Sequence, residues 1–128
     1  IILNKFFNNM ISLFHCNSSY MCSKEMIRDN KITNFTPTFL IEDCNNFDNQ
    51  YTNIITFINP GRKGLKSYEI EFLNKSKNIN YIIYLACNYK AFLKDKNILN
   101  KFQIIDSIEL DVMPLTEMTE NLIFMKLS

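Results

Sequence analysis

Residues 81–93 read YIIYLACNYKAFL, and this stretch decides how the chain folds. Its first six residues form an unbroken apolar run, rich in aromatic and β-branched side chains, which is typical of a buried strand. Asn88 follows almost at once and is a suitable N-cap for a helix that begins at Tyr89. Cys87 is therefore expected at the carboxyl end of a buried strand and at the amino end of a helix.

Both ends matter for the chemistry of a thiol. Open α/β sheets bind their ligands at the carboxyl ends of their strands. The amino end of a helix carries partial positive charge, which favours the thiolate form of cysteine. The alternative interpretation is that Cys87 is one more small buried apolar residue, and its position alone does not separate the two.

The rest of the chain alternates between strand patterns and helix patterns. Strands are predicted at 11–14, 38–41, 54–58, 81–86, 103–110 and 121–127, helices at 18–30, 67–77 and 89–101, and a polar loop at 45–52. This order predicts βαβ units and an α/β fold with a mainly parallel sheet. The last two strands have no helix between them and predict an antiparallel C-terminal pair. Residues 1–128 are expected to form one partial domain.

The composition is that of an ordinary globular chain, with 47% hydrophobic and 21% charged residues. No apolar stretch approaches the roughly 18 residues that cross a bilayer, so no membrane partner is expected. Cys16, Cys22, Cys44 and Cys87 show no CxxC spacing, and His15 is the one histidine, which argues against a metal site. The three cysteines before Cys87 are expected to be core thiols. An intracellular, cytoplasmic location is expected, with an organelle or the nucleus as alternatives.

Glycine is scarce, and its placement is informative. The two glycines, Gly61 and Gly64, both lie in residues 59–64, NPGRKG. Nucleotide-binding α/β folds use a glycine-rich turn after their first strand, where the backbone approaches the ligand. That turn is expected either to be lost or to lie upstream of residue 1, where the missing initiator Met also indicates a longer protein.

Basic residues gather in the middle of the chain, although the net charge is only +1. Residues 62–101 contain nine basic and three acidic side chains. This bias is compatible with a polyanionic partner. The alternative is a solvated lysine face on two helices.

Three segments resemble motifs of the RNA (uracil-5-)-methyltransferases. Residues 59–65, NPGRKGL, resemble the family's DPPRKGL motif; residues 82–88, IIYLACN, resemble I-x-Y-x-S-C-N-P; and residues 111–120, DVMPLTEMTE, resemble D-M-F-P-x-T-x-H-x-E. The motifs occur in the family's order, and the similarity runs from about residue 11 to the end. The resemblance implies the C-terminal catalytic part of a Rossmann-like class I methyltransferase, with S-adenosyl-L-methionine as methyl donor and tRNA or rRNA as substrate.

The resemblance also implies roles for individual residues. Cys87 matches the family nucleophile, which adds to C6 of uracil, and Glu120 matches the base that removes the C5 proton. Arg62 matches the motif arginine that organises the catalytic pocket. His15, Asp43 and Asn59 fall where the family contacts S-adenosyl-L-methionine.

Several positions depart from the family pattern. The family's first strand, its glycine loop and its N-terminal RNA-binding parts have no counterpart. The substituted positions are His15 for Glu, Asn59 for Asp, Gly61 for Pro, Ala86 for Ser, Tyr89 for Pro and Met118 for His. The cofactor positions are thus altered more than the catalytic ones.

The implied activity is methylation of uridine C5 in RNA through a covalent cysteine–C6 adduct. C5 is a poor nucleophile until a thiolate adds to C6 and turns the ring into an enolate. The alternative is a degenerate, non-catalytic remnant that binds RNA or a protein. A third interpretation, a thiol-redox domain, is disfavoured because no resolving cysteine lies near Cys87.

Overall fold

The computed structural model describes residues 5–39, 41–111, 115 and 119–128. The chain divides into two compact units, Ile1–Gln50 and Tyr51–Ser128. That the whole chain forms one partial domain remains a prediction. No helix among the described residues is long and apolar enough to cross a bilayer.

The first unit contains a two-stranded parallel sheet with two helices. Met10 pairs with Phe35 at one end of this sheet, and Leu13 pairs with Thr38 at the other. The helix that follows the first strand has no buried side chain. The elements of this unit are β1 (Met10–Leu13), α1 (Asn17–Asp29), β2 (Phe35–Thr38) and α2 (Ile41–Gln50).

Two predictions for the first unit are wrong. The strand predicted at 38–41 lies three residues earlier, as β2, and Pro37 is tolerated there because β2 pairs only with β1 among the described residues. The loop predicted at 45–52 is mostly helix α2. Its asparagines have poor helix propensity, but α2 contacts both strands and Cys44 is buried, so tertiary packing overrides the local preference.

The second unit is a four-stranded mixed sheet in the order β3-β4-β6-β5. β3 runs parallel to β4, while β6 lies between β4 and β5 and runs antiparallel to both. The predicted antiparallel C-terminal pair is thus confirmed. The elements are β3 (Ile54–Ile58), α3 (Ser67–Lys75), β4 (Ile79–Ala86), α4 (Tyr89–Ile98), β5 (Phe102–Leu110) and β6 (Glu120–Leu127).

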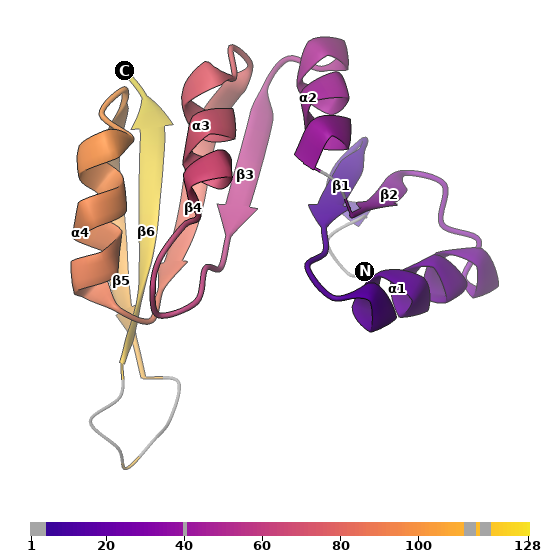
Figure 1. The fold of residues 1–128 in the computed structure, drawn as a ribbon, viewed down its shortest axis with the longest axis horizontal. Helices are drawn as coiled ribbons and strands as arrows, with labels where there is room; N and C mark the ends of the chain where they lie inside the picture. The colour runs from indigo at the N-terminus through magenta and orange to yellow at the C-terminus, as the bar shows by residue number, and fades with distance from the viewer. Residues whose placement is uncertain (1–4, 40, 112–114, 116–118) are drawn as a thin grey trace. The chain divides into compact units, whose positions relative to one another are not determined.

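The core of the second unit lies on one face of this sheet, where α3 and α4 pack (Figure 1). Side chains alternate along β4, so Ile82, Tyr84 and Ala86 point into the core. Tyr84 meets Phe92 of α4 edge to face, with 5.0 Å between ring centroids. Such a pair contributes about 0.5–1.5 kcal/mol beyond its burial, so β4 and α4 are held firmly together.

The opposite face of the sheet is apolar and open in this unit. Phe57 is 58% exposed and Ile105 is 57% exposed. A hollow of about 210 Å³ on this face is lined only by apolar side chains, among them Ile55, Tyr81 and Phe124. Exposed apolar surfaces of this kind mark interaction surfaces or aggregation liabilities.

Candidate active site

Cys87 occupies the position that the sequence predicts. β4 ends at the buried residue Ala86, and Cys87 follows it with an exposed side chain. The side-chain oxygen of Asn88 accepts a hydrogen bond from the Lys90 N–H at 3.2 Å, so Asn88 is the N-cap of α4. The thiol therefore lies between a buried strand and the positive end of a helix.

The strand register brings Glu120 to the same end of the sheet. Ala86 of β4 pairs with Asn121 of β6, and this is the last pair of that antiparallel ladder. One step beyond it are Cys87 on one strand and Glu120 on the other. Glu120 is half-buried and pairs with Leu110 on its other side. A thiol and a carboxylate thus lie at the same end of neighbouring strands.

Asn88 also fixes the loop that carries Arg62. Its side-chain nitrogen donates a hydrogen bond to the Arg62 carbonyl at 3.0 Å. One side chain therefore caps the helix behind Cys87 and holds the loop that follows β3. Sequence reasoning identified the cap but missed this second contact. The Arg62 side chain itself is exposed.

A buried carboxyl group, that of Asp95, also holds this loop through hydrogen bonds. Oδ2 of Asp95, on α4, accepts hydrogen bonds from the Leu65 N–H at 2.8 Å and from the Tyr84 hydroxyl at 2.7 Å. Gly64 closes a turn by donating its N–H to the Gly61 carbonyl at 2.9 Å. Gly64 has φ +80°, and a Cβ there would lie 2.6 Å from Oδ2 of Asp95. Only glycine fits this position.

These two hydrogen bonds offset part of the cost of burying the carboxyl group of Asp95 away from water. Burial, followed by the hydrogen bond to Asp95, raises the pKa of the Tyr84 phenol, so this hydroxyl remains a donor. Oδ1 of Asp95 is buried and has no hydrogen-bond partner among the described residues. Sequence reasoning missed Asp95. Its spacing from Phe92 and Leu99, three and four residues, places it on the buried stripe of α4 and could have identified it.

The predicted cofactor positions fall in both units. Asn59 directly follows β3 and is exposed, at the same end of the sheet as Cys87. His15 is exposed and lies two residues after β1. Asp43 lies in the first turn of α2, and its side chain is outside the described residues. Residues 112–114 and 116–118 of the third motif also lie outside them. In the second unit, Asn59 therefore lies at the same end of the sheet as the three predicted catalytic positions.

The expectation that three cysteines are core thiols holds only for Cys44, which is buried. Cys16 and Cys22 are exposed, so for them the prediction is wrong. The reason for Cys16 is that α1 begins at Asn17, which makes Cys16 the N-cap rather than a packed residue. Hydrogen bonds from the backbone N–H groups at the start of this helix lower the pKa of the Cys16 thiol.

The second-unit site offers three chemical functions at one end of the sheet. Cys87 could act as a nucleophile, Glu120 as a base and Arg62 as a cation. This set suits addition to an electron-poor ring followed by removal of a proton. Among the described residues, no three His, Cys, Asp or Glu side chains are grouped so that they could hold a metal ion.

Comparison with curated proteins identifies relatives among RNA methyltransferases, although no protein-family model matches the chain. A protein of Acanthamoeba polyphaga mimivirus named as an RNA methyltransferase is 32% identical over 88 residues, covering 68% of this chain and 22% of that protein. A Nanoarchaeum equitans protein named as an uncharacterized RNA methyltransferase is 39% identical over 71 residues, covering 56% and 16%. A Haemophilus ducreyi protein named as a 23S rRNA (uracil(747)-C(5))-methyltransferase is 39% identical over 57 residues, covering 44% and 26%. The chain thus spans about a quarter or less of each of these relatives.

Solved structures show the same fold. The tRNA (uracil-54, C5)-methyltransferase of Pyrococcus abyssi, solved with S-adenosyl-L-homocysteine, matches 97% of this chain and 29% of its own, with a TM-score of 0.71 and 20% identity. A Streptococcus pneumoniae protein described as a tRNA (m1A22) methyltransferase matches 94% of this chain and 54% of its own, with a TM-score of 0.68 and 12% identity. The predicted fold and the predicted resemblance are both confirmed: the chain has the Rossmann-like fold of class I methyltransferases, and its sequence is related to RNA methyltransferases that include a uracil-C5 enzyme.

Proposed function

We propose that the protein containing this chain methylates C5 of uridine in tRNA or rRNA, through a covalent bond between Cys87 and C6 of the base. The observation that carries this proposal is the β4–β6 register, which puts Cys87 and Glu120 at one end of neighbouring strands. The Asn88 contact, which holds the Arg62 loop beside them, supports it further.

The first step belongs to Cys87. Its thiolate adds to C6, a new S–C6 bond forms, and the C5–C6 π electrons move onto C5 and the conjugated carbonyl oxygen. Cys87 lies directly before the N-cap of α4, where the helix carries partial positive charge. Arg62 offers a guanidinium to the enolate oxygen that develops during it.

The second step belongs to Glu120. S-Adenosyl-L-methionine supplies the methyl group that C5 takes up, which leaves a saturated C5 carrying both a methyl group and a proton. Glu120 accepts that proton, the freed electron pair restores the C5–C6 double bond, and the S–C6 bond breaks to release Cys87. The products are 5-methyluridine and S-adenosyl-L-homocysteine.

The chain supplies only part of a methyl-donor site. His15, Asp43 and Asn59 remain predicted contacts to S-adenosyl-L-methionine, because the sequence resemblance puts them at the family's cofactor positions. Among the described residues, β1 pairs only with β2 in the first unit, and β3 pairs only with β4 in the second. A glycine-rich strand and turn would supply further contacts to the donor. An intracellular, cytoplasmic location remains a prediction.

A second candidate is a non-catalytic remnant that binds RNA or a protein. It is favoured by Asn59, which stands where the family has an acid, and by the lack of a second glycine-rich turn in the sequence. Binding of S-adenosyl-L-methionine by the protein separates the two candidates, because a remnant has no use for the donor.

The adduct itself gives the sharpest test of the enzyme. In any form of the protein that binds S-adenosyl-L-methionine, Glu120→Gln should accumulate an RNA–protein adduct that survives denaturing gels, because the amide cannot accept the C5 proton. Glu109→Gln, a matched change on the exposed face of β5, should turn over normally. Cys87→Ala should give neither adduct nor product. Normal turnover by Glu120→Gln would remove Glu120 from the mechanism.

A further inference from the structure

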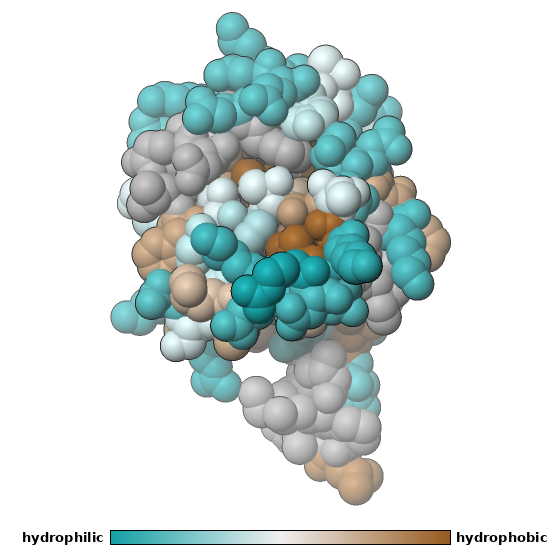
Figure 2. All heavy atoms as spheres, turned by 90° about the vertical axis from the view of Figure 1, so that its right-hand side faces the viewer, coloured by the Kyte–Doolittle hydropathy of each residue, from teal (hydrophilic) through white to brown (hydrophobic). Residues whose placement is uncertain are grey.

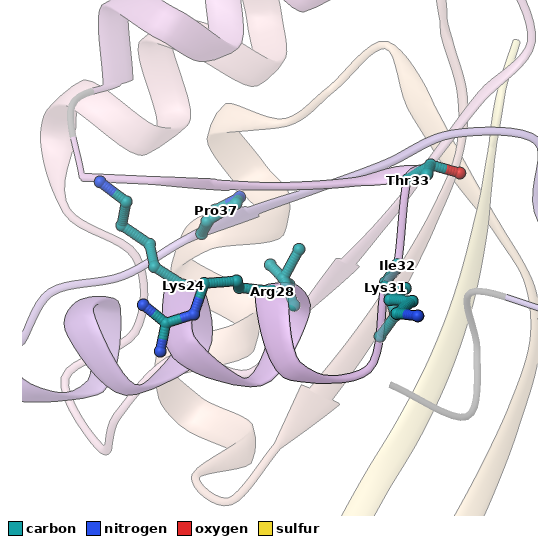
Figure 3. Close-up of a pocket in the computed structure, with 7 residues that line it drawn as sticks. Lys24, Arg28, Lys31, Ile32, Thr33 and Pro37 are labelled. Carbon is teal, nitrogen blue, oxygen red and sulfur yellow. The ribbon is translucent and has the colours of Figure 1, made fainter.

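A hollow of about 330 Å³ lies between the C-terminal half of α1 and strand β2 (Figure 3). This volume is at the lower end of the range found for ligand pockets. Its lining combines half-buried apolar side chains with exposed cations, and none of its seven lining residues is acidic. The apolar members are Ile27, Ile32 and Pro37, and the cations are Lys24, Arg28 and Lys31.

The cations are concentrated at this hollow. Residues 1–50 contain four lysine and arginine side chains, and only Lys5 is not part of the lining. Two acids, Glu25 and Asp29, adjoin lining residues in the sequence, and Asp29 accepts the Nε–H of Arg28 at 3.2 Å, which is one of the five N–H donors of a guanidinium. Figure 2, viewed from the side where Figure 1 draws α1, shows a small apolar patch bordered by hydrophilic side chains.

The backbone at the end of α1 shapes the hollow. The Ile32 N–H donates to the Ile27 carbonyl at 3.0 Å, and the Lys31 N–H donates to the Arg28 carbonyl at 3.2 Å. These two bonds form a Schellman motif, which brings Ile27 and Ile32 together. Lys31 has φ +53°, at the position where glycine is usual and any side chain is strained. The chain thus holds a lysine where glycine would be more stable, and that lysine lines the hollow.

We propose that this hollow binds a single-stranded segment of RNA, with phosphates on the three cations and one nucleobase against the apolar side chains. The inference rests on the proposed function, which makes RNA the substrate class. A single strand combines repeated negative charge with flat apolar base faces, and both halves of the lining find a partner in it. A purely acidic peptide such as polyglutamate would match the cations alone.

Salt-dependent binding of a short fluorescent oligouridylate to residues 1–128 tests the proposal. Lys24→Gln/Lys31→Gly should weaken binding roughly ten-fold and make the slope of log K against log salt shallower by about 1.4, since each neutralised phosphate contributes about 0.7 to that slope and two lysines are removed. Lys5→Gln removes a cation of the same unit outside the hollow and should leave both quantities unchanged. Polyglutamate should compete at least ten-fold more weakly than oligouridylate.

Lys31→Gly separates binding from folding. Glycine adopts a positive φ without strain, so this substitution should raise the melting temperature while it weakens RNA binding. If Lys31 had only a structural role, a more stable variant would bind RNA as well as the wild type. Equal effects of Lys5→Gln and Lys31→Gly, no binding of oligouridylate by the wild-type chain, or equal competition by polyglutamate would each overturn the proposal. If a donor-binding form of the protein binds RNA through the hollow but its Glu120→Gln variant accumulates no Cys87 adduct, the proposed function fails and this inference stands.

Discussion

Replacing Gly64 by alanine should destabilise the second unit by about 2–5 kcal/mol. Its φ of +80° makes a side chain strained, which costs about 1–2 kcal/mol. The new Cβ would also lie 2.6 Å from Oδ2 of Asp95. To relieve this contact, the carboxylate must move away from the Leu65 N–H and the Tyr84 hydroxyl, and weakening a buried hydrogen bond costs about 1–3 kcal/mol.

Urea denaturation of Gly64→Ala beside Gly61→Ala measures this effect within one loop. A Cβ at Gly61 meets nothing within 4 Å, and Gly61 is not among the positive-φ glycines. Gly61→Ala should therefore be neutral, or more stable by about 0.4–1 kcal/mol through the unfolded chain. Equal stability of the two variants would refute the role assigned to the Asp95 contact.

A double-mutant cycle separates strain from contact. In an Asp95→Ala background, Gly64→Ala should cost only the backbone term of about 1–2 kcal/mol, because no carboxylate remains to displace. If Gly64→Ala costs the same amount with and without Asp95, the carboxylate is not what excludes a side chain at Gly64.

Three further outcomes are expected for cofactor binding, thiol reactivity and the cap of α4. Residues 1–128 should bind S-adenosyl-L-methionine weakly or not at all in calorimetry, because the glycine-rich strand and turn are absent from the sequence; low-micromolar binding would contradict this. In alkylation with peptide mapping, the exposed thiols of Cys87 and Cys16 should react before buried Cys44, and Cys16 should react at lower pH than Cys22 because its lowered pKa provides thiolate there; early labelling of Cys44 would count against the packing described. Asn88→Asp should keep the helix cap but lose the donor to the Arg62 carbonyl, whereas Asn88→Ala should lose both and cost about 1 kcal/mol more in urea denaturation; equal stability would show that the cap contributes nothing.

Most of the fold can be predicted from the sequence, because in the second unit the local sequence patterns agree with the strands and helices that form. The apolar runs at 54–58 and 81–86 are too short for helices and are followed by strong turn or cap signals, so the pattern places both strands to within two residues. The sequence pattern misses α2 because its side chains favour a loop locally and only its contact with β1 and β2 makes it helical. It displaces β2 because Pro37 reads as a strand breaker, although an edge strand accepts it.

The sequence predicts the residues of the candidate site that belong to recognisable motifs. It does not predict the residues that hold those motifs in place. Motif residues at strand ends identify Cys87, Glu120 and Arg62. A motif search does not find Asp95, because a single acid among lysines is usually a solvated surface charge. Its spacing from Phe92 and Leu99 shows instead that it lies on the buried face of the helix. The Schellman motif at Lys31 escapes such a search because no glycine marks the turn, and the N-cap position of Cys16 depends on where α1 begins, which sequence patterns fix only to within a few residues.

Exchange of the C5 hydrogen of uridine tests the covalent role of Cys87 most directly, because it needs no methyl donor. Addition of the thiolate to C6 lets C5 take a proton from solvent, and reversal through Glu120 releases the original hydrogen. RNA labelled with tritium at C5 of uridine should therefore lose tritium to water in the presence of the protein. Cys22→Ala, which removes another exposed thiol, should release it at the wild-type rate, while Cys87→Ala should release none. Tritium release that persists in Cys87→Ala, or its absence with the wild-type protein, would contradict the covalent mechanism.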